Sequence, residues 1–199
     1  MRVLSNKEID SFSKYKHSSS KSSYEEFLKA GPCTWGEKMF PDFLSANSIT
    51  IIGHLPLQIT MFLVLSQVGG NITTDNPIPR YLMLATGISL QWFSLLDIMD
   101  GIRARRLKNG SPLGRLVDEC GDTITQANYC VLLAYAFQVQ NPMYELVYFA
   151  MNSVFFAMEM RYVITGELVM AVGEFSSVEI ELFLSLTAIY MGIYGNEGL

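Results

Sequence analysis

Charged residues are scarce in this sequence: Asp, Glu, Lys and Arg make up only 17% of its 199 residues. Three long stretches, at residues 43–74, 81–96 and 123–144, contain none of them. Half of the residues are hydrophobic and the mean hydropathy is +0.25, which is high for a soluble protein. Because the apolar residues gather in the charge-free stretches, the composition indicates a membrane protein.

The sequence also lacks a positive net charge, a cysteine framework and an N-terminal signal peptide. The formal net charge of −5 gives no support to nucleic-acid binding. The spacing of Cys33, Cys120 and Cys130 matches neither a disulfide framework nor a metal site, and Cys120 and Cys130 are interpreted as small packing residues of a helix. Since the first 42 residues are polar, we expect the first membrane span itself to act as the insertion signal.

The charge-free stretches and the turn signals between them predict about five membrane-spanning helices. The expected spans lie at residues 47–68, 80–105, 111–138, 142–164 and 177–194. The predicted fold is therefore an all-α, polytopic transmembrane helix bundle, embedded in the membrane over residues 43–199. A single histidine, His54, lies inside the first span, and we interpret it as packed or hydrogen-bonded rather than as a ligand.

Residues 1–42 are expected to form a cytosolic N-terminal segment. Apolar and charged residues alternate between Tyr24 and Phe43, a pattern typical of an amphipathic helix that lies in the membrane interface. A partly ordered tail explains the same composition, and the sequence does not decide between the two.

Basic residues predict the orientation of the bundle. Seven Lys or Arg residues precede the first span, one lies in the loop at 69–80, and five lie between 103 and 115. Because basic residues concentrate on the cytoplasmic side of a membrane, the N-terminus and the 103–115 segment are expected to face the cytosol. The loop at 69–80 then faces the lumen, in agreement with the glycosylation sequon at Asn71.

Four aspartates lie at the edges of the charge-free stretches. Asp97 and Asp100 are three residues apart, and Asp118 and Asp122 are four apart, so each pair shares one face of a helix. An acidic face at the membrane surface is the simpler explanation, but aspartates at this boundary are costly unless they are paired or bind a ligand. Carboxylates in such a cluster repel one another, and hard divalent cations prefer oxygen ligands of this kind. The sequence therefore predicts one divalent-cation site.

The segment between the two aspartate pairs predicts a sharp turn. Asn109-Gly110 is typical of a turn, and Ser111-Pro112 is typical of a helix cap followed by the first helical residue. The result is a helical hairpin that carries two carboxylates on each arm.

Small and basic residues accompany the aspartates. Gly101, Ala104 and Gly114 allow a helix or a nucleotide to approach closely, and plain helix packing explains them as well. Arg105 is suited to binding phosphate oxygens, whereas the orientation signal explains it together with the other basic residues of 103–108. Spacing alone does not decide between these roles.

These residues form the pattern Asp97-x2-Asp100-Gly101-x2-Ala104-Arg105, eight further residues, then Gly114-x3-Asp118-x3-Asp122. The pattern, with eight fixed residues in 26 positions, resembles the signature of the CDP-alcohol phosphotransferases. Flanking segments are similar to those of the eukaryotic choline and ethanolamine phosphotransferases, and the resemblance covers roughly residues 14–125. These segments are Lys14–Ser19, Ala46–Thr50, Arg105-Arg106 and Ser111–Gly114.

The resemblance implies an enzyme that moves phosphocholine or phosphoethanolamine from CDP-choline or CDP-ethanolamine to diacylglycerol and releases CMP. It implies two Mg²⁺ or Mn²⁺ ions, held by Asp97, Asp100, Asp118 and Asp122. It assigns substrate binding to Asn47, Gly101, Ala104, Arg105 and Gly114. It further implies an integral membrane protein of the endoplasmic reticulum or Golgi, with its active site facing the cytosol.

The sequence departs from this family pattern at three points. Ala46 replaces the proline that precedes Asn47. Glu119 follows the third aspartate, where the related enzymes have a histidine that is proposed to accept the proton, so Glu119 is the expected catalytic base and Asp122 the alternative. The family core has six spans and this sequence predicts five, so the chain is expected to be truncated at its C-terminus.

Two other functions stay open at this stage. One is a phosphatidyltransferase that uses CDP-diacylglycerol and a soluble alcohol such as inositol, although the flanking segments argue against it. The other is an inactive truncated paralogue that binds nucleotide or metal, which Glu119 favours and the intact aspartates disfavour. The sequence does not separate choline from ethanolamine, and a homodimer is an open alternative.

Overall fold

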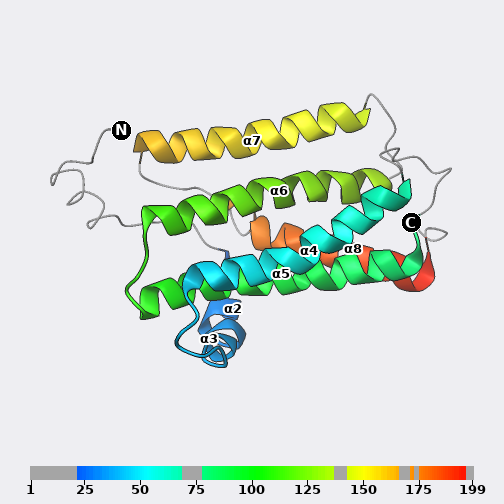
Figure 1. Ribbon diagram of the computed structural model, residues 1–199. Coiled ribbons are helices and arrows are strands. Elements are labelled where there is room, and N and C mark those ends of the chain that lie inside the picture. The colour runs from blue at the N-terminus through cyan, green and yellow to red at the C-terminus, as the bar shows by residue number, and fades with distance from the viewer. Residues whose placement is uncertain (1–21, 69–77, 137–142, 166–170, 173–174, 196–199) are drawn as a thin grey trace, which may run out of the picture.

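The computed structural model describes residues 22–68, 78–136, 143–165, 171–172 and 175–195. Five long helices lie along one another within these ranges (Figure 1). They are α4 (Ala46–Val68), α5 (Arg80–Arg106), α6 (Pro112–Ala136), α7 (Met143–Thr165) and α8 (Ser177–Tyr194). Their bounds agree with the predicted spans to within two residues, which confirms the helix bundle. The expected lumenal site at Asn71 and the segment 14–19 lie outside the described residues.

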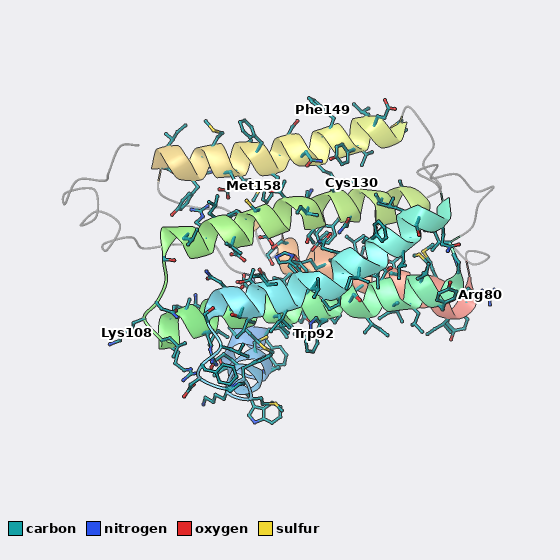
Figure 2. All side chains as sticks on the ribbon, viewed as in Figure 1. Arg80, Trp92, Lys108, Cys130, Phe149 and Met158 are labelled. Atoms are coloured by element: carbon teal, nitrogen blue, oxygen red, sulfur yellow. The ribbon has the colours of Figure 1, made fainter. Side chains whose placement is uncertain are left out.

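Three of these helices, α4, α5 and α8, are long and apolar enough to cross a membrane. Helices α6 and α7 carry several charged residues, so a membrane-spanning role for these two stays a prediction. On α7, Phe149 points away from the rest of the bundle and is 70% exposed (Figure 2). Such an exposed apolar side chain suits contact with lipid tails, which are as apolar as the side chain itself.

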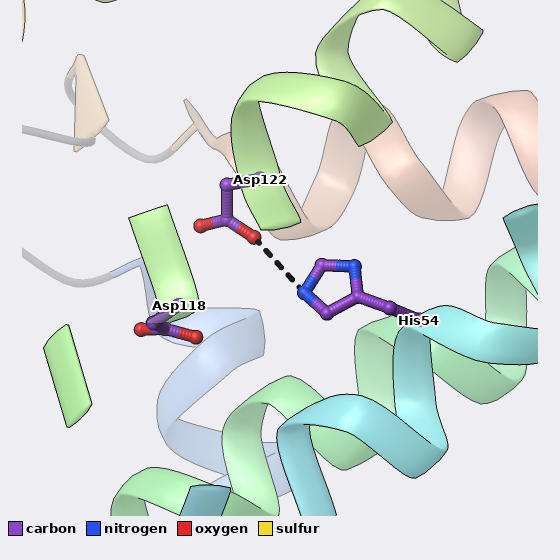
Figure 3. Close-up of side chains that lie close together, drawn as sticks. All are labelled: His54, Asp118 and Asp122. Carbon is purple, nitrogen blue, oxygen red and sulfur yellow. Dashed lines mark ion pairs between the residues drawn. The ribbon is translucent and has the colours of Figure 1, made fainter. Parts of the chain in front are cut away.

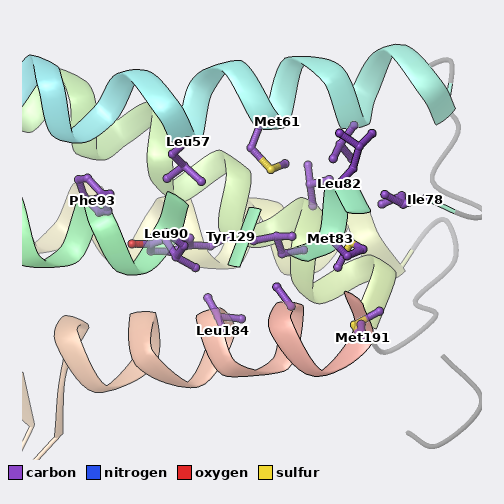
Figure 4. Close-up of a cluster of buried hydrophobic side chains, with 14 residues drawn as sticks. Leu57, Met61, Ile78, Leu82, Met83, Leu90, Phe93, Tyr129, Leu184 and Met191 are labelled. Carbon is purple, nitrogen blue, oxygen red and sulfur yellow. The ribbon is translucent and has the colours of Figure 1, made fainter. Parts of the chain in front are cut away.

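Helix α5 is the central helix, and it packs against α4 on one side and α8 on another. A cluster of buried apolar side chains fills the space between α4, α5, α6 and α8 (Figure 4). It includes Leu57, Leu90, Tyr129 and Leu184. Cys130 on α6 is also buried, as expected, but Cys120 is exposed, so its interpretation as a packing residue is wrong.

Small residues bring α5 and α8 into close contact. A Cβ atom on Gly87 would lie only 2.8 Å from the carbonyl oxygen of Ser185, and one on Gly192 would lie 2.7 Å from the backbone nitrogen of Leu84. The Ser185 hydroxyl donates a hydrogen bond of 2.9 Å to the Gly87 carbonyl. Glycine and serine therefore allow these helices to approach through their backbones, as is common in membranes.

The turn between α5 and α6 confirms the predicted hairpin. Helix α6 begins at Pro112, and the Ser111 hydroxyl accepts a hydrogen bond of 3.0 Å from the Gly114 backbone, as an N-cap does. The residue with a left-handed backbone is Lys108, at φ 53°, rather than the adjoining Asn109-Gly110. Lys108 marks one end of the bundle and Arg80, at the start of α5, marks the other (Figure 2).

Two short strands lie between α7 and α8 along the chain. Residues 171–176 contribute β1 (Ala171–Val172) and β2 (Phe175–Ser176), an antiparallel pair that the sequence did not predict. Ser176 also caps α8: its hydroxyl accepts from the Val178 backbone, and the Glu179 side chain reaches back to the Ser176 backbone nitrogen at 2.8 Å.

The N-terminal segment forms two short helices, α2 (Ser23–Ala30) and α3 (Pro32–Glu37), beneath the turn end of α5 (Figure 1). Leu28 and Cys33 are buried against α5, whereas several large apolar side chains are more than 60% exposed. These exposed residues are Phe27, Trp35, Met39 and Phe43. The segment is thus helical over 23–30 and 32–37, and its place in the membrane interface stays a prediction.

A buried ion pair ties this segment to the end of α5. Arg103 and Glu37 are both fully buried, and an Arg103 Nη donates to Glu37 Oε1 at 2.8 Å. Arg103 also donates to the carbonyls of Phe40, Pro41 and Leu44. Arg106 forms a second pair with Glu37 at 3.0 Å. The segment from Glu37 to Leu44 is therefore bound to the part of α5 that carries two of the aspartates.

We predict that Glu37→Gln destabilises the protein, because it leaves the buried Arg103 charge without its partner. The loss of one member of a buried pair costs on the order of 3 kcal/mol. For a chain of this size the melting temperature of the detergent-solubilised protein should fall by about 6–12 °C. Asp42→Asn is the matched control, because Asp42 also pairs with Arg106 but is 79% exposed. An equal fall in melting temperature for both substitutions would contradict the stabilising role of the buried pair.

The Glu37 pair also predicts a pH dependence. Burial alone would raise the pKa of Glu37, but hydrogen bonds and charge from Arg106 and Arg103 outweigh it and hold the pKa below its ordinary value of 4.5. The contribution of the pair to stability is then complete above pH 4.5 and is lost as the pH falls through the lowered pKa. The melting temperatures of the native protein and the Glu37→Gln variant should therefore converge in this acidic range.

Candidate functional site

The candidate site lies at the end of the bundle where the start of α4, the end of α5 and the start of α6 meet (Figure 1). Helix α4 contributes Asn47, Thr50 and His54, which follow the three- and four-residue spacing of one helix face. The hairpin formed by α5 and α6 contributes the four aspartates. The site is thus assembled from one face of each of three helices.

The structure brings the four aspartates together in two overlapping groups. Asp97, Asp100 and Asp118 each offer a carboxylate oxygen, and these atoms lie within 4.8 Å of one another. In the second group, Asp118 and Asp122 lie at the same close range from a nitrogen of His54 (Figure 3). Asp118 belongs to both groups, so it is the carboxylate on which the cluster is centred.

Several polar atoms of this cluster have no hydrogen-bond partner within the described part of the chain. They are Asp118 Oδ1, Asp122 Oδ1 and His54 Nε2, all of which are buried. Asp100 is also buried, and its Oδ2 accepts a hydrogen bond from the Thr50 hydroxyl. Buried carboxylates at this range repel one another, and oxygen ligands of this kind fit a hard divalent cation such as Mg²⁺ or Mn²⁺. The donor set therefore fits the expected metal.

The predicted substrate-binding residues border the aspartates. A Cβ atom on Gly114 would lie 3.0 Å from Asn47 Oδ1, so the start of α4 touches the start of α6 at these two positions. The Arg105 guanidinium lies over Gly101, where a Cβ atom would be 3.4 Å from Nη1. Ala104 is half-buried on the same helix. Packing of α4 against α6 accounts for the first contact and a side chain of the same helix for the second, and nucleotide binding by the five residues stays a prediction.

Glu119 lies outside the two aspartate groups. Its carboxylate accepts a hydrogen bond of 3.0 Å from Arg115, one turn earlier on α6. Arg115 also pairs with Glu159 of α7 at 2.9 Å and stacks 3.5 Å from the ring centre of Tyr162. Glu119 therefore takes part in an ionic network between α6 and α7, and its role as a base stays a prediction.

This network was not predicted from the sequence, and neither was the position of Thr50 and His54 beside the aspartates. The four-residue spacing of Arg115 and Glu119 is a signal that predicts their pairing. The spacing of Thr50 and His54 from Asn47 would likewise have placed both on its helix face. The interpretation of His54 as hydrogen-bonded and packed is confirmed by its contacts with Thr125 and Phe93, but the ring also faces the aspartates.

A groove of about 210 Å³ lies beside the cluster, between α4 and α6. Three of its wall residues, Ile51, Leu55 and Ile124, are apolar and more than half exposed, whereas Thr50 and His54 line it next to the aspartates. The remaining lining residues are Gln58, Val117 and Gly121. The groove thus lies at an apolar outer surface of the bundle, and two of its lining residues, Thr50 and His54, contact Asp100 and Asp122.

Comparison with known proteins shows which family this chain resembles. The model of the CDP-alcohol phosphatidyltransferase family matches residues 43–196. Choline/ethanolaminephosphotransferase 1 of Arabidopsis thaliana is 37% identical over 103 residues, which cover 50% of this chain and 24% of that protein. The protein of the same name from Saccharomyces cerevisiae is 31% identical over 165 residues, or 80% of this chain and 40% of that one.

An uncharacterised CDP-alcohol phosphatidyltransferase class-I family protein 1 of Dictyostelium discoideum is 25% identical over 199 residues, which cover 98% of this chain and 50% of that protein. The chain therefore spans half or less of the length of these curated relatives.

We predict opposite effects of Asp118→Asn with and without a divalent cation. Without the cation, the variant should melt at a higher temperature than the native protein, because one repelling charge is removed. With Mg²⁺ or Mn²⁺, binding at about 100 times the Kd should stabilise the native protein by about 2.7 kcal/mol, and Asp118→Asn should lose most of this gain.

Glu145→Gln is the matched control, because Glu145 is an exposed carboxylate at the start of α7. Thermal melting with EDTA and with added cation measures both effects. If the cation raised the melting temperature of Asp118→Asn as much as that of the native protein, the result would contradict the metal site.

Proposed function

Because the chain belongs to the CDP-alcohol phosphatidyltransferase family, we propose that it transfers phosphocholine or phosphoethanolamine from a CDP-alcohol to diacylglycerol. The observation that carries this proposal is the gathering of Asp97, Asp100, Asp118 and Asp122 in two overlapping ligand groups beside an apolar-walled groove. The names of the Arabidopsis and yeast relatives support choline or ethanolamine as the alcohol. The proposed location is the membrane of the endoplasmic reticulum or Golgi, with the site facing the cytosol.

The four aspartates are the proposed ligands of two Mg²⁺ or Mn²⁺ ions, and Asp118 belongs to both candidate ligand groups. When bound, such ions neutralise charge on the attacking and leaving oxygens of a phosphoryl transfer. Arg105 and Asn47 border the same space and are suited to the phosphates and the nucleotide, respectively. Gly101, Ala104 and Gly114 leave room for the nucleotide between the helices.

The groove between α4 and α6 is the proposed route for diacylglycerol. Its apolar wall suits the acyl chains, and its polar end, at Thr50 and His54, lies next to Asp100 and Asp122. The diacylglycerol hydroxyl oxygen forms a bond to the phosphorus that carries the choline or ethanolamine. The bond from this phosphorus to the CMP oxygen breaks, and CMP leaves.

Glu119 is the proposed acceptor of the hydroxyl proton, and Asp122 is the alternative. The ion pair with Arg115 stabilises the charged form of Glu119 but also occupies its carboxylate. Proton transfer to Glu119 therefore requires this pair to open when the lipid binds. Asp122 lies 3.9 Å from His54, which lines the groove, and its Oδ1 has no hydrogen-bond partner among the described residues.

The proposal predicts that membranes containing this chain convert labelled CDP-choline or CDP-ethanolamine, with diacylglycerol, to phospholipid in a cation-dependent reaction. Glu119→Gln should lower turnover about 10²–10⁴-fold and leave CDP-alcohol binding largely intact, as the loss of a general base does. Glu159→Gln is the matched control, because Glu159, on α7, pairs with the same Arg115 that pairs with Glu119.

Product from CDP-diacylglycerol and inositol, but from neither CDP-alcohol, would replace the proposal with the sister reaction. Absence of any product would favour an inactive paralogue that binds nucleotide or metal. Normal turnover of Glu119→Gln would make Asp122 the leading candidate for the base.

A further inference from the structure

His54 is the one residue with a nitrogen donor in the metal-ligand groups found among the described residues. Its Nε2 atom lies 3.9 Å from Asp122 Oδ1, and His54, Asp118 and Asp122 each offer one ligand atom within 4.8 Å of the other two (Figure 3). The three side chains come from two helices, α4 and α6, and they converge from opposite sides. The arrangement is that of a mixed nitrogen and oxygen donor set.

The imidazole ring is held in place on three sides. Its Nδ1 atom lies 3.2 Å from the Thr125 hydroxyl, and its face lies 4.7 Å from the Phe93 ring centre. Gly121 lies against the ring so closely that a Cβ atom there would clash with Nε2 and would lie 2.6 Å from Cε1. In metal sites, the second nitrogen of a histidine ligand is usually fixed by such a hydrogen bond. When Nδ1 donates to Thr125, Nε2 presents its lone pair to the aspartates.

The atoms that face one another here lack other partners. His54 Nε2, Asp118 Oδ1 and Asp122 Oδ1 are buried and make no hydrogen bond within the described part of the chain. When Nε2 carries no proton, its lone pair and the two carboxylate oxygens repel one another, and a divalent cation between them removes this repulsion. The distance of 3.9 Å between Nε2 and Oδ1 is close to the sum of two metal–ligand bonds of about 2.1 Å.

We propose that His54 is a ligand of the divalent cation that Asp118 and Asp122 bind. This inference rests on the metal site of the proposed function and adds a nitrogen donor to its oxygen ligands. Mg²⁺ takes oxygen ligands, whereas imidazole suits Zn²⁺ and first-row transition metals such as Fe²⁺ and Ni²⁺, the series whose weakest-binding member is Mn²⁺. The half of the site next to α4 therefore favours Mn²⁺ over Mg²⁺ more strongly than four aspartates alone would.

Pulsed electron paramagnetic resonance of bound Mn²⁺ tests the ligand directly. The protein should be the full chain in detergent, without a histidine tag and with Mn²⁺ as the probe. The native chain should show the ¹⁴N modulation of a coordinated imidazole, and His54→Leu should lose it. The sequence holds two histidines, so His17→Gln is the matched control and should keep the modulation.

A competition titration of Mn²⁺ against Mg²⁺ supplies the second readout. His54→Leu should weaken Mn²⁺ binding by about tenfold or more, a loss typical even for a partner outside the ligand set, and should change Mg²⁺ binding less. Gln58→Leu is the control, because Gln58 is one turn further along α4 and also bonds to Thr125, at 3.4 Å, but lies outside the donor set. Its ratio of Mn²⁺ to Mg²⁺ affinity should equal that of the native chain.

The outcomes separate this inference from the proposed function. Mn²⁺ that binds in the native chain and is lost in Asp118→Asn, but gives no imidazole modulation, overturns the role of His54 and leaves the aspartate site standing. A native chain that binds no Mn²⁺ overturns both. A ¹⁴N modulation that survives in His54→Leu but disappears in His17→Gln also overturns the role of His54. This outcome can be read even where His54→Leu is less stable than the native chain.

Discussion

The mutual repulsion of four carboxylates, held together at one end of an apolar bundle, is the constraint on which the rest of the structure depends. Water would screen such charges on an open surface, but a partly buried cluster is screened far less. The helices must therefore supply enough packing and pairing to hold the aspartates at this range. A bound divalent cation removes the repulsion, which couples the stability of this end of the bundle to the ligand.

Two features outside the cluster provide that support. The buried pair of Arg103 and Glu37 fixes the N-terminal helices against the end of α5. Polar contacts join α4 to α6 further along, where Gln58 accepts a hydrogen bond of 3.0 Å from Asn128. The aspartate arms are thus held from both sides, and groups on rigid helices are positioned more precisely than groups on loops.

Local patterns in the sequence were sufficient to predict the helices and the hairpin. The charge-free stretches, together with the turn signals between them, predicted the helix bounds to within two residues, and Ser111 indicated the start of α6. The aspartate pairs could be placed because residues three or four apart share a helix face. Contacts between distant residues could not be predicted in this way: Arg103 meets Glu37 across 66 residues, and His54 meets Thr125 across 71. Such pairs depend on how helices pack, which periodicity within one helix does not encode.

The site has one part that helix packing explains and another part that only a bound ligand explains. Gly114 would be needed for close contact between α4 and α6 alone, whereas a bound cation explains the oxygens of Asp118 and Asp122 that have no hydrogen-bond partner among the described residues. The most direct measurement is an anomalous difference map from crystals of the chain grown with Mn²⁺ and CDP. The account predicts Mn²⁺ peaks bounded by the four aspartates, with the CDP phosphates beside them. Aspartates that face apart, or CDP bound elsewhere with no Mn²⁺ at the cluster, would contradict it.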